Sequence, residues 1–157
     1  MKIIAVTGAV GTGKTTLAKK LSKFLKFKYI DVDKVIKKYK LAKWYDRKRR
    51  SWVVDEKRLA KVLTKLIKGY RKDLVIDSHF SHYISPKYVD LCIVTKCNLE
   101  ELKRRLSKKK YHKAKIDENL QVEIFDIVLT EALNKKHKVK VIETDKRYNL
   151  KDIKKFL

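Results

Sequence analysis

Apolar residues along the chain fall into two kinds of stretch that alternate, short extended runs and longer stretches with helical spacing. The extended runs predict strands at residues 3–7, 28–31, 74–77, 89–95 and 139–142. The helical spacing predicts helices at residues 15–25, 99–106 and 120–133, a short one at the end of the chain, and one whose apolar face is formed by Leu59, Val62, Leu63, Leu66 and Ile67. The first run is apolar without a break, which is typical of a parallel strand buried on both faces.

This order of elements predicts an α/β fold. Strands that alternate with helices form a doubly wound sheet, here a five-stranded parallel sheet flanked by helices. No Pro-, Ser- or Gly-rich linker and no internal repeat divides the 157 residues, so we expect a single domain over 1–157. In sheets of this kind ligands bind beyond the carboxyl ends of the strands, which is where the candidate chemistry has to be sought.

The charge of the chain is far from balanced. The 42 Lys and Arg residues against 18 Asp and Glu give a formal net charge of +24. A surplus of this size attracts polyanions such as nucleotides or RNA. Many of the lysines also fall on helix faces, where a solvated coat that aids solubility is the alternative explanation, and both interpretations stay open.

The two cysteines and the apolar runs bear on location. Cys92 and Cys97 match no metal-ligand spacing, which favours free thiols in a reducing compartment. No run reaches the ~18 apolar residues that a membrane-spanning helix needs, and the apolar start is too short for a secretory signal. We therefore expect a soluble protein without a membrane partner, cytoplasmic or, in a cell with a nucleus, possible in the nucleus.

The strongest chemical signal follows the first predicted strand. The segment Gly8-Ala9-Val10-Gly11-Thr12-Gly13-Lys14-Thr15 matches the phosphate-loop (P-loop) pattern G-x-x-x-x-G-K-[ST] in full and opens a predicted helix. Its backbone N–H groups and the positive helix end converge on phosphates, and glycines such as Gly11 and Gly13 permit that close approach. Lys14 would reach the β- and γ-phosphates, Thr15 would ligate Mg²⁺ and Thr16 would contact the α-phosphate. The segment therefore predicts a P-loop NTPase that binds ATP and Mg²⁺.

A second signal ends the strand at 74–77. Asp77-Ser78-His79 lands on the same edge of the sheet as the P-loop. A carboxylate at such a strand end is the usual second support for nucleotide-bound magnesium, so Asp77 is the candidate metal ligand and catalytic carboxylate. His79 is a candidate catalytic residue that orients water or contacts phosphate, the alternative being a hydrogen-bonded loop histidine.

With these motifs the chain resembles the adenylate kinase isoenzyme 6 type of nucleoside-monophosphate kinase. The resemblance rests on the P-loop, on Asp77-Ser78-His79 as the D-x-H strand end, and on the stretch 117–125, DENLQVEIF, which is similar to the family's D-N-x-Q-x-E-I-F helix start with one residue inserted. It implies ATP-dependent phosphorylation of AMP and related monophosphates, an accompanying ATPase activity, and partners in a small-subunit ribosomal protein and rRNA.

The resemblance also implies two mobile segments, a monophosphate-binding arm at about 31–54 and a lid at about 108–118, and we expect loops in both. In the arm, Trp44 and Tyr45 would stack on a base. The run Arg47, Lys48, Arg49 and Arg50 would hold a monophosphate or an RNA backbone. The alternative is a core-facing aromatic residue beside a solvated basic run.

In the lid, Lys109 stands where the resemblance implies a nucleotide-contacting arginine. A lysine keeps the charge but lacks the planar fork of arginine, which bears on lid closure and nucleotide discrimination. Beyond it, Asn119 and Glu123 share a helix face at i,i+4, whereas Gln121 does not lie on that face. Helix capping and surface polarity explain this pair on physical grounds alone, and the resemblance favours a role in placing the lid or a partner.

These features together predict a broad-specificity nucleoside-monophosphate kinase of adenylate kinase type, with AMP as the favoured acceptor and an ATPase activity, acting in maturation of the small ribosomal subunit. Two alternatives stay open. One is an assembly ATPase that binds a ribosomal protein and rRNA with little kinase role. The other is a P-loop kinase for another small metabolite.

Overall fold

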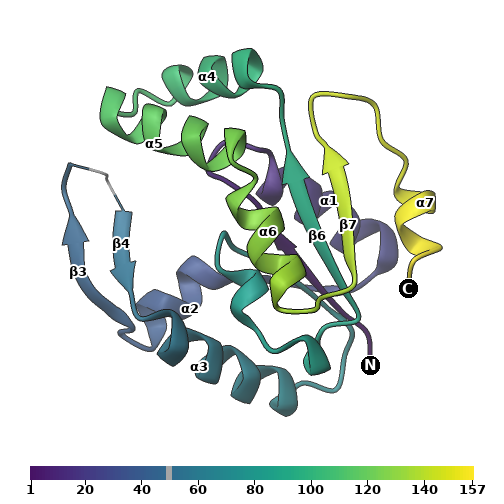
Figure 1. Cartoon of the computed structure of the whole chain (residues 1–157). Coiled ribbons are helices and arrows are strands. Elements are labelled where there is room, and N and C mark those ends of the chain that lie inside the picture. The colour runs from purple at the N-terminus through teal and green to yellow at the C-terminus, as the bar shows by residue number, and fades with distance from the viewer. Residues whose placement is uncertain (49–50) are drawn as a thin grey trace.

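The computed structural model describes residues 1–48 and 51–157 and is built on a five-stranded sheet (Figure 1). The strands are β1 (Ile3–Thr7), β2 (Lys28–Asp31), β5 (Leu74–Asp77), β6 (Leu91–Lys96) and β7 (Val139–Glu143). They run in the order β2-β5-β1-β6-β7, and every pairing between neighbours is parallel. The predicted α/β sheet is therefore confirmed, with β1 at its centre.

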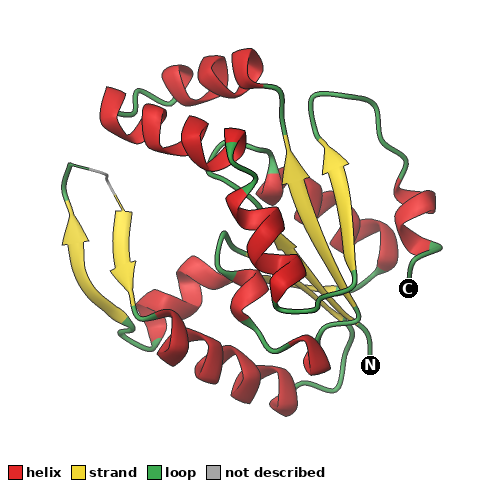
Figure 2. Ribbon diagram, in the orientation of Figure 1, coloured by secondary structure: helices red, strands yellow, loops and turns green. Residues whose placement is uncertain are grey.

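Helices cover both faces of this sheet (Figure 2). The helices are α1 (Lys14–Leu25), α2 (Val32–Lys38), α3 (Glu56–Gly69), α4 (Leu99–Lys108), α5 (Lys113–Ile124), α6 (Ile127–Asn134) and α7 (Leu150–Lys154). Two short 3₁₀ helices, η1 (Ser81–Tyr83) and η2 (Pro86–Tyr88), connect β5 to β6. Within the described residues, no helix is long and apolar enough to cross a membrane.

The alternation of side chains along β1 builds two cores. Ile3 and Ala5 pack on the face that α3 and α6 cover, whereas Ile4 and Val6 pack on the face that α1 covers. All five residues of β1 are buried. Since successive side chains of a strand point to opposite faces, a strand covered on both faces needs apolar residues at every position. That requirement explains the unbroken apolar run in the sequence.

The region predicted as one helix at 120–133 is divided, so that prediction was wrong in its extent. Helix α5 begins earlier, at Lys113, and ends at Ile124, and α6 starts after Asp126. Asp126 has φ 50° and ψ 34°, a left-handed conformation that breaks the helix, and its carboxylate pairs with Lys96 at the end of β6. The predicted lid loop at 108–118 is likewise mostly helical, with only a short turn between α4 and α5.

The arm at 31–54 is also structured, contrary to the predicted loop. It consists of α2 followed by an antiparallel hairpin of β3 (Ala42–Asp46) and β4 (Ser51–Val54), which projects from the body in Figure 1. The Tyr45 and Trp52 rings meet edge to face with centroids 4.8 Å apart. Trp44 is 59% exposed, so the alternative of a core-facing aromatic is wrong for this residue. Arg49 and Arg50 of the predicted basic run lie outside the described residues.

The packing of α3 against the sheet gives a direct test of this core. Leu63 is 2% exposed, whereas Lys65 on the same helix lies in solvent. We expect Leu63→Ala to lower the free energy of unfolding by about 2–5 kcal/mol, because truncation leaves a cavity between α3 and the sheet. Lys65→Ala should change it by less than about 0.5 kcal/mol. Urea unfolding followed by far-UV circular dichroism measures both, and equal effects would contradict the assigned core.

Candidate active site

The P-loop connects the centre of the sheet to α1 and depends on glycine. Gly8, Gly11 and Gly13 have φ of 145°, 89° and 85°, a range that side chains of L-residues rarely adopt. A Cβ on Gly8 would lie 2.4 Å from Thr95 Oγ1, and one on Gly11 would lie 2.8 Å from a methyl carbon of Leu106. Neither position has room for a side chain, so the close turn requires glycine on steric grounds as well.

Threonine hydroxyls brace the loop from beneath. Thr12 Oγ1 lies 2.7 Å from Thr95 Oγ1 on β6 and donates to the Ala9 carbonyl at 2.8 Å. Thr144 Oγ1, beyond β7, donates to the Thr12 carbonyl at 2.6 Å. Arg105 on α4 donates in turn to Thr144 Oγ1 at 3.0 Å. The P-loop is therefore tied to three neighbouring elements before any ligand is bound, which is the preorganisation that phosphate binding needs.

Lys14, Thr15 and Thr16 form the first turn of α1. The Lys14 ammonium lies across the loop and donates to the Ala9 carbonyl at 2.8 Å. Burial lowers the pKa of Lys14 from 10.5 to about 8, the Asp77 carboxylate opposes this shift, and the charge of Lys109 adds to it. Thr15 and Thr16 are exposed at the positive end of the helix, where anions are stabilised.

Asp77 lies beside the P-loop because β5 pairs with β1, with Asp77 next to Val6. Asp77 is 7% exposed, and its Oδ2 accepts a hydrogen bond from the Tyr29 hydroxyl at 2.8 Å. Oδ1 is buried and has no hydrogen-bond partner among the described residues. A buried carboxylate oxygen without a donor is costly, and a cation at this point would compensate it.

Acidic groups beside Asp77 strengthen this preference for a cation. Asp31 ends the adjacent strand β2 in register with Asp77 and caps α2 by accepting from the N–H of Asp33. Burial, then the Asp31 and Asp77 charges, raise the pKa of Asp33. Among the described residues no group of three His, Cys, Asp or Glu side chains has the geometry of a protein-only metal site.

His79 follows Asp77 by two residues and lies on the same edge of the sheet. Its ring packs on Phe80 with centroids 3.8 Å apart, and its carbonyl oxygen lies 3.3 Å from Thr7 Oγ1. Burial above all, and then the charge of Lys14, hold the pKa of His79 well below the ordinary value for histidine. The ring is therefore neutral near pH 7 and able to act as a hydrogen-bond donor or acceptor rather than as a cation.

Two buried polar residues of α5 accept hydrogen bonds from the P-loop and from the residue after β6. Asn119 Oδ1 accepts from the Val10 N–H of the P-loop at 3.1 Å, and Glu123 Oε1 accepts from the Cys97 N–H at 3.1 Å. Asn119 and Glu123 are 9% and 8% exposed, whereas Gln121 between them is exposed. The interpretation as surface polarity was therefore wrong for this pair. Their i,i+4 spacing was the feature of the sequence that pointed to this pair. Tyr29, which bonds Asp77, and Thr95, which contacts Thr12, also belong to the site, but no sequence pattern indicated them.

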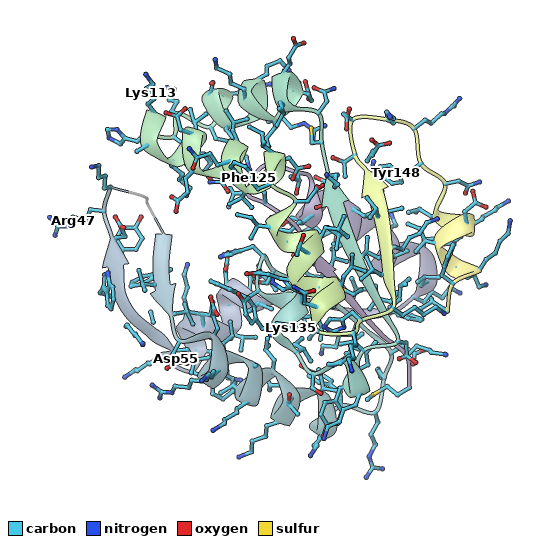
Figure 3. The ribbon with its side chains drawn as sticks, in the orientation of Figure 1. Arg47, Asp55, Lys113, Phe125, Lys135 and Tyr148 are labelled. Atoms are coloured by element: carbon cyan, nitrogen blue, oxygen red, sulfur yellow. The ribbon has the colours of Figure 1, made fainter. Side chains whose placement is uncertain are left out.

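The segments predicted as arm and lid both carry basic residues. Lys109 caps the end of α4 with an exposed side chain, and its charge contributes to lowering the pKa of Lys14. Figure 3 places Arg47, at the end of β3, and Lys113, at the start of α5, on the same side of the molecule. Both segments therefore present a basic residue on this side of the molecule.

Comparison with known proteins agrees with this architecture. The family model of the AAA domain matches residues 4–126. A Methanocaldococcus jannaschii protein, provisionally named an adenylate kinase, is 39% identical over 142 residues, which are 90% of this chain and 78% of the relative. An adenylate kinase isoenzyme 6 homologue of Caenorhabditis elegans is 33% identical over 129 residues, covering 82% of this chain and 71% of the relative.

Solved structures of similar fold come from other P-loop kinases. Shikimate kinase from Acinetobacter baumannii superposes with a TM-score of 0.66 at 19% identity, covering 99% of this chain and 89% of that chain. Deoxyadenosine kinase from M. mycoides superposes with a TM-score of 0.59 at 12% identity, covering 99% and 98%. These two likenesses concern the fold alone, and the sequence relatives decide the family. The chain belongs to the adenylate kinase family that includes the isoenzyme 6 homologues, within the P-loop AAA-domain class.

Proposed function

We propose that this protein transfers the γ-phosphoryl group of ATP to a nucleoside monophosphate, with AMP as the favoured acceptor. One observation carries the proposal. A complete P-loop lies beside a buried carboxylate, Asp77, one oxygen of which has no hydrogen-bond partner among the described residues. That pairing suits a phosphate chain with its metal ion, and the adenylate kinase relatives support the choice of acceptor.

In this proposal the P-loop holds the triphosphate. The N–H groups around Gly11 and Gly13 and the start of α1 receive the phosphate oxygens, with Thr16 at the α-phosphate. Lys14 exchanges its contact with the Ala9 carbonyl for the β- and γ-phosphate oxygens, where its charge offsets the charge of the transition state. Its depressed pKa then rises, because the phosphates favour the charged ammonium.

The metal site consists of Thr15 and Asp77. Thr15 would offer its hydroxyl from the first turn of α1, and Asp77 would offer Oδ1, directly or through water. When bound, Mg²⁺ supplies charge neutralisation and orientation of the phosphates. Tyr29 holds the other carboxylate oxygen of Asp77 by a hydrogen bond, so the direction in which Oδ1 points is set by the protein.

The remaining residues act on the acceptor and on water. His79, neutral at pH 7, would orient the attacking group or a water molecule. Lys109 would close over the nucleotide phosphates from the turn after α4. On the arm, the exposed Trp44 and the Tyr45–Trp52 pair would contact the acceptor base, with Arg47 and Lys48 near its phosphate.

A second candidate function is an assembly ATPase that binds a ribosomal protein and rRNA. The observation that favours it is the net charge of +24 together with exposed aromatic residues on the hairpin, a combination that suits single-stranded nucleic acid. In that case water replaces the monophosphate as acceptor at the same P-loop. RNA binding would then weaken steeply with salt, because neutralised phosphates release counterions.

The assay that separates these functions follows ATP and Mg²⁺ with AMP, CMP, UMP, dAMP or no acceptor, and measures every nucleotide by ion-exchange chromatography. Conversion of AMP to ADP well above the rate of water attack is the expected result, and EDTA should abolish it. Hydrolysis of ATP without conversion of any monophosphate would instead support the assembly ATPase. Failure of every nucleoside monophosphate alongside transfer to a non-nucleotide acceptor would support a kinase for another metabolite.

Lys14 and Asp77 are expected to be essential in the same assay. Lys14→Ala and Asp77→Asn should each lower the rate by at least about 100-fold, since each removes a charge that stabilises the transferring group or its metal. Lys20→Ala, an exposed lysine of the same helix, serves as the control and should leave the rate unchanged. Near-normal turnover of Lys14→Ala would contradict the assigned site.

Asn119 offers a test of the contact between α5 and the P-loop. Asn119→Ala removes the acceptor of the Val10 N–H, a hydrogen bond worth about 1 kcal/mol, so ADP affinity should fall about fivefold. Gln121→Ala, two residues away and exposed, is the matched control and should bind ADP normally. Isothermal titration calorimetry measures both, and an unchanged affinity for Asn119→Ala would show that the loop holds its shape without α5.

A further inference from the structure

A buried chain of hydrogen bonds runs from the surface of α6 to the base of the P-loop. Glu131 Oε2 lies 2.8 Å from His82 Nε2, and His82 Nδ1 lies 2.8 Å from Thr7 Oγ1. Thr7 Oγ1 also lies 3.3 Å from the His79 carbonyl. His82 is 1% exposed and Thr7 is 0% exposed, while Glu131 retains contact with solvent. The proposed phosphoryl-transfer roles do not involve Glu131, His82 or Thr7.

This series of hydrogen bonds ends beside the P-loop. Thr7 is the last residue of β1 and directly precedes Gly8 of the P-loop, and His79 stands two residues after Asp77. The Thr7 hydroxyl therefore lies between the segment proposed to hold phosphate and the segment proposed to hold the metal. The backbone at Gly8 is closely packed, since the space beside it is filled by Thr95 and Thr12. A change in the hydrogen bond of Thr7 is therefore expected to displace both the P-loop and the segment after Asp77.

The single hydrogen of the Thr7 hydroxyl makes the arrangement depend on His82. A neutral His82 that donates through Nε2–H to Glu131 has an acceptor at Nδ1, and Thr7 then donates to Nδ1. A protonated His82 donates from Nδ1 to Thr7 Oγ1 instead. The hydrogen of Thr7 then turns to the His79 carbonyl, so the charge of His82 decides which of the two groups accepts it.

We infer that His82 is a positioning residue of the phosphoryl-transfer site: anchored by Glu131, its neutral ring accepts the hydrogen of Thr7 and thereby ties the segment that contains His79 to the end of β1, next to Gly8. This inference rests on the proposed kinase function for its activity readout only. The hydrogen-bond chain itself can be tested without turnover.

The charged and titratable surroundings of His82 come from several elements. On α6, Glu131 pairs with Nε2 and Lys135 lies over the ring of Tyr83 at 4.6 Å. After α6, His137 Nε2 lies 2.9 Å from the His82 carbonyl. In η1, the Tyr83 hydroxyl shares the Glu131 carboxylate at 3.4 Å, and before η1 the His79 ring lies close enough for the charge of His82 to add to the lowering of its pKa by burial. Burial lowers the pKa of His82, Glu131 opposes the shift, and Lys135 and His137 add to it, so the neutral form prevails near pH 7.

Two amide substitutions of His82 test the contacts of its two ring nitrogens one at a time. The amide of asparagine occupies the place of Nδ1, so His82→Asn keeps an acceptor for Thr7 and loses Glu131. The longer His82→Gln reaches Glu131 and leaves Thr7 without its partner. We expect His82→Gln to lower kcat about tenfold with little change in KM for ATP, and His82→Asn to lose clearly less.

Thr7 provides the second pair of variants, and Tyr83 the control. The nearly isosteric Thr7→Val should lower kcat as His82→Gln does, and Thr7→Ser, which keeps the hydroxyl, should restore it. Tyr83→Phe removes the hydrogen bond from the Tyr83 hydroxyl to Glu131, which is not part of the series Glu131–His82–Thr7, and should leave kcat unchanged. Thermal unfolding of each variant identifies any that fail to fold, and the Thr7 pair keeps the test valid if the His82 variants do.

The dependence of kcat on pH distinguishes positioning from a purely structural role. The wild type should show an inflection below about pH 6.5, where His82 gains a proton, and His82→Asn should lack it. Nitrogen-15 NMR of the imidazole should show the Nε2–H form at neutral pH, whether or not the protein turns over AMP. The Nδ1–H form, or equal kcat and equal pH profiles for His82→Asn and His82→Gln, would overturn the inference.

Discussion

The burial of β1 on both faces and its pairing along both edges is the constraint on which the rest of the structure depends. All five residues of the strand are buried, with β5 on one side and β6 on the other. Because the neighbours are parallel, their carboxyl ends lie at one edge, and the P-loop must leave the sheet between Asp77 and Thr95. The bracing of Gly8 by Thr95 and the approach of Asp77 to Lys14 follow from that exit point.

A second level of organisation comes from the broken helix α5–α6. Asn119 binds the P-loop, Glu123 binds the end of β6, and Glu131 binds His82. Between them, Asp126 turns the chain in a left-handed conformation and pairs with Lys96. One helical unit therefore contacts the phosphate loop, the sheet and the segment after Asp77.

The charge of the protein is distributed in a way that fits an anionic substrate. Many of the lysines stand on exposed helix faces, while Lys14 is enclosed beside Asp77 and Asp33. The surface lysines accord with the solvated coat and raise the potential that draws polyanions toward the molecule. The enclosed lysine acts over a short range, where lower solvent screening makes a single charge count for more. In the proposed function, the surface lysines attract the substrate and Lys14 acts on its phosphates.

The sequence by itself determined the sheet, the P-loop and the D-S-H strand end, because buried parallel strands require unbroken apolar runs and the phosphate turn requires glycine at fixed spacing. It did not determine the hairpin at Ala42–Val54, where the pairing of Tyr45 with Trp52 is a cross-strand contact with no local pattern. Nor did it determine the break at Asp126, the burial of Asn119 or the contact of His82 with Thr7 and Glu131. Those features join residues up to 109 positions apart, and only the packed tertiary structure decides which polar groups lose water and must find one another.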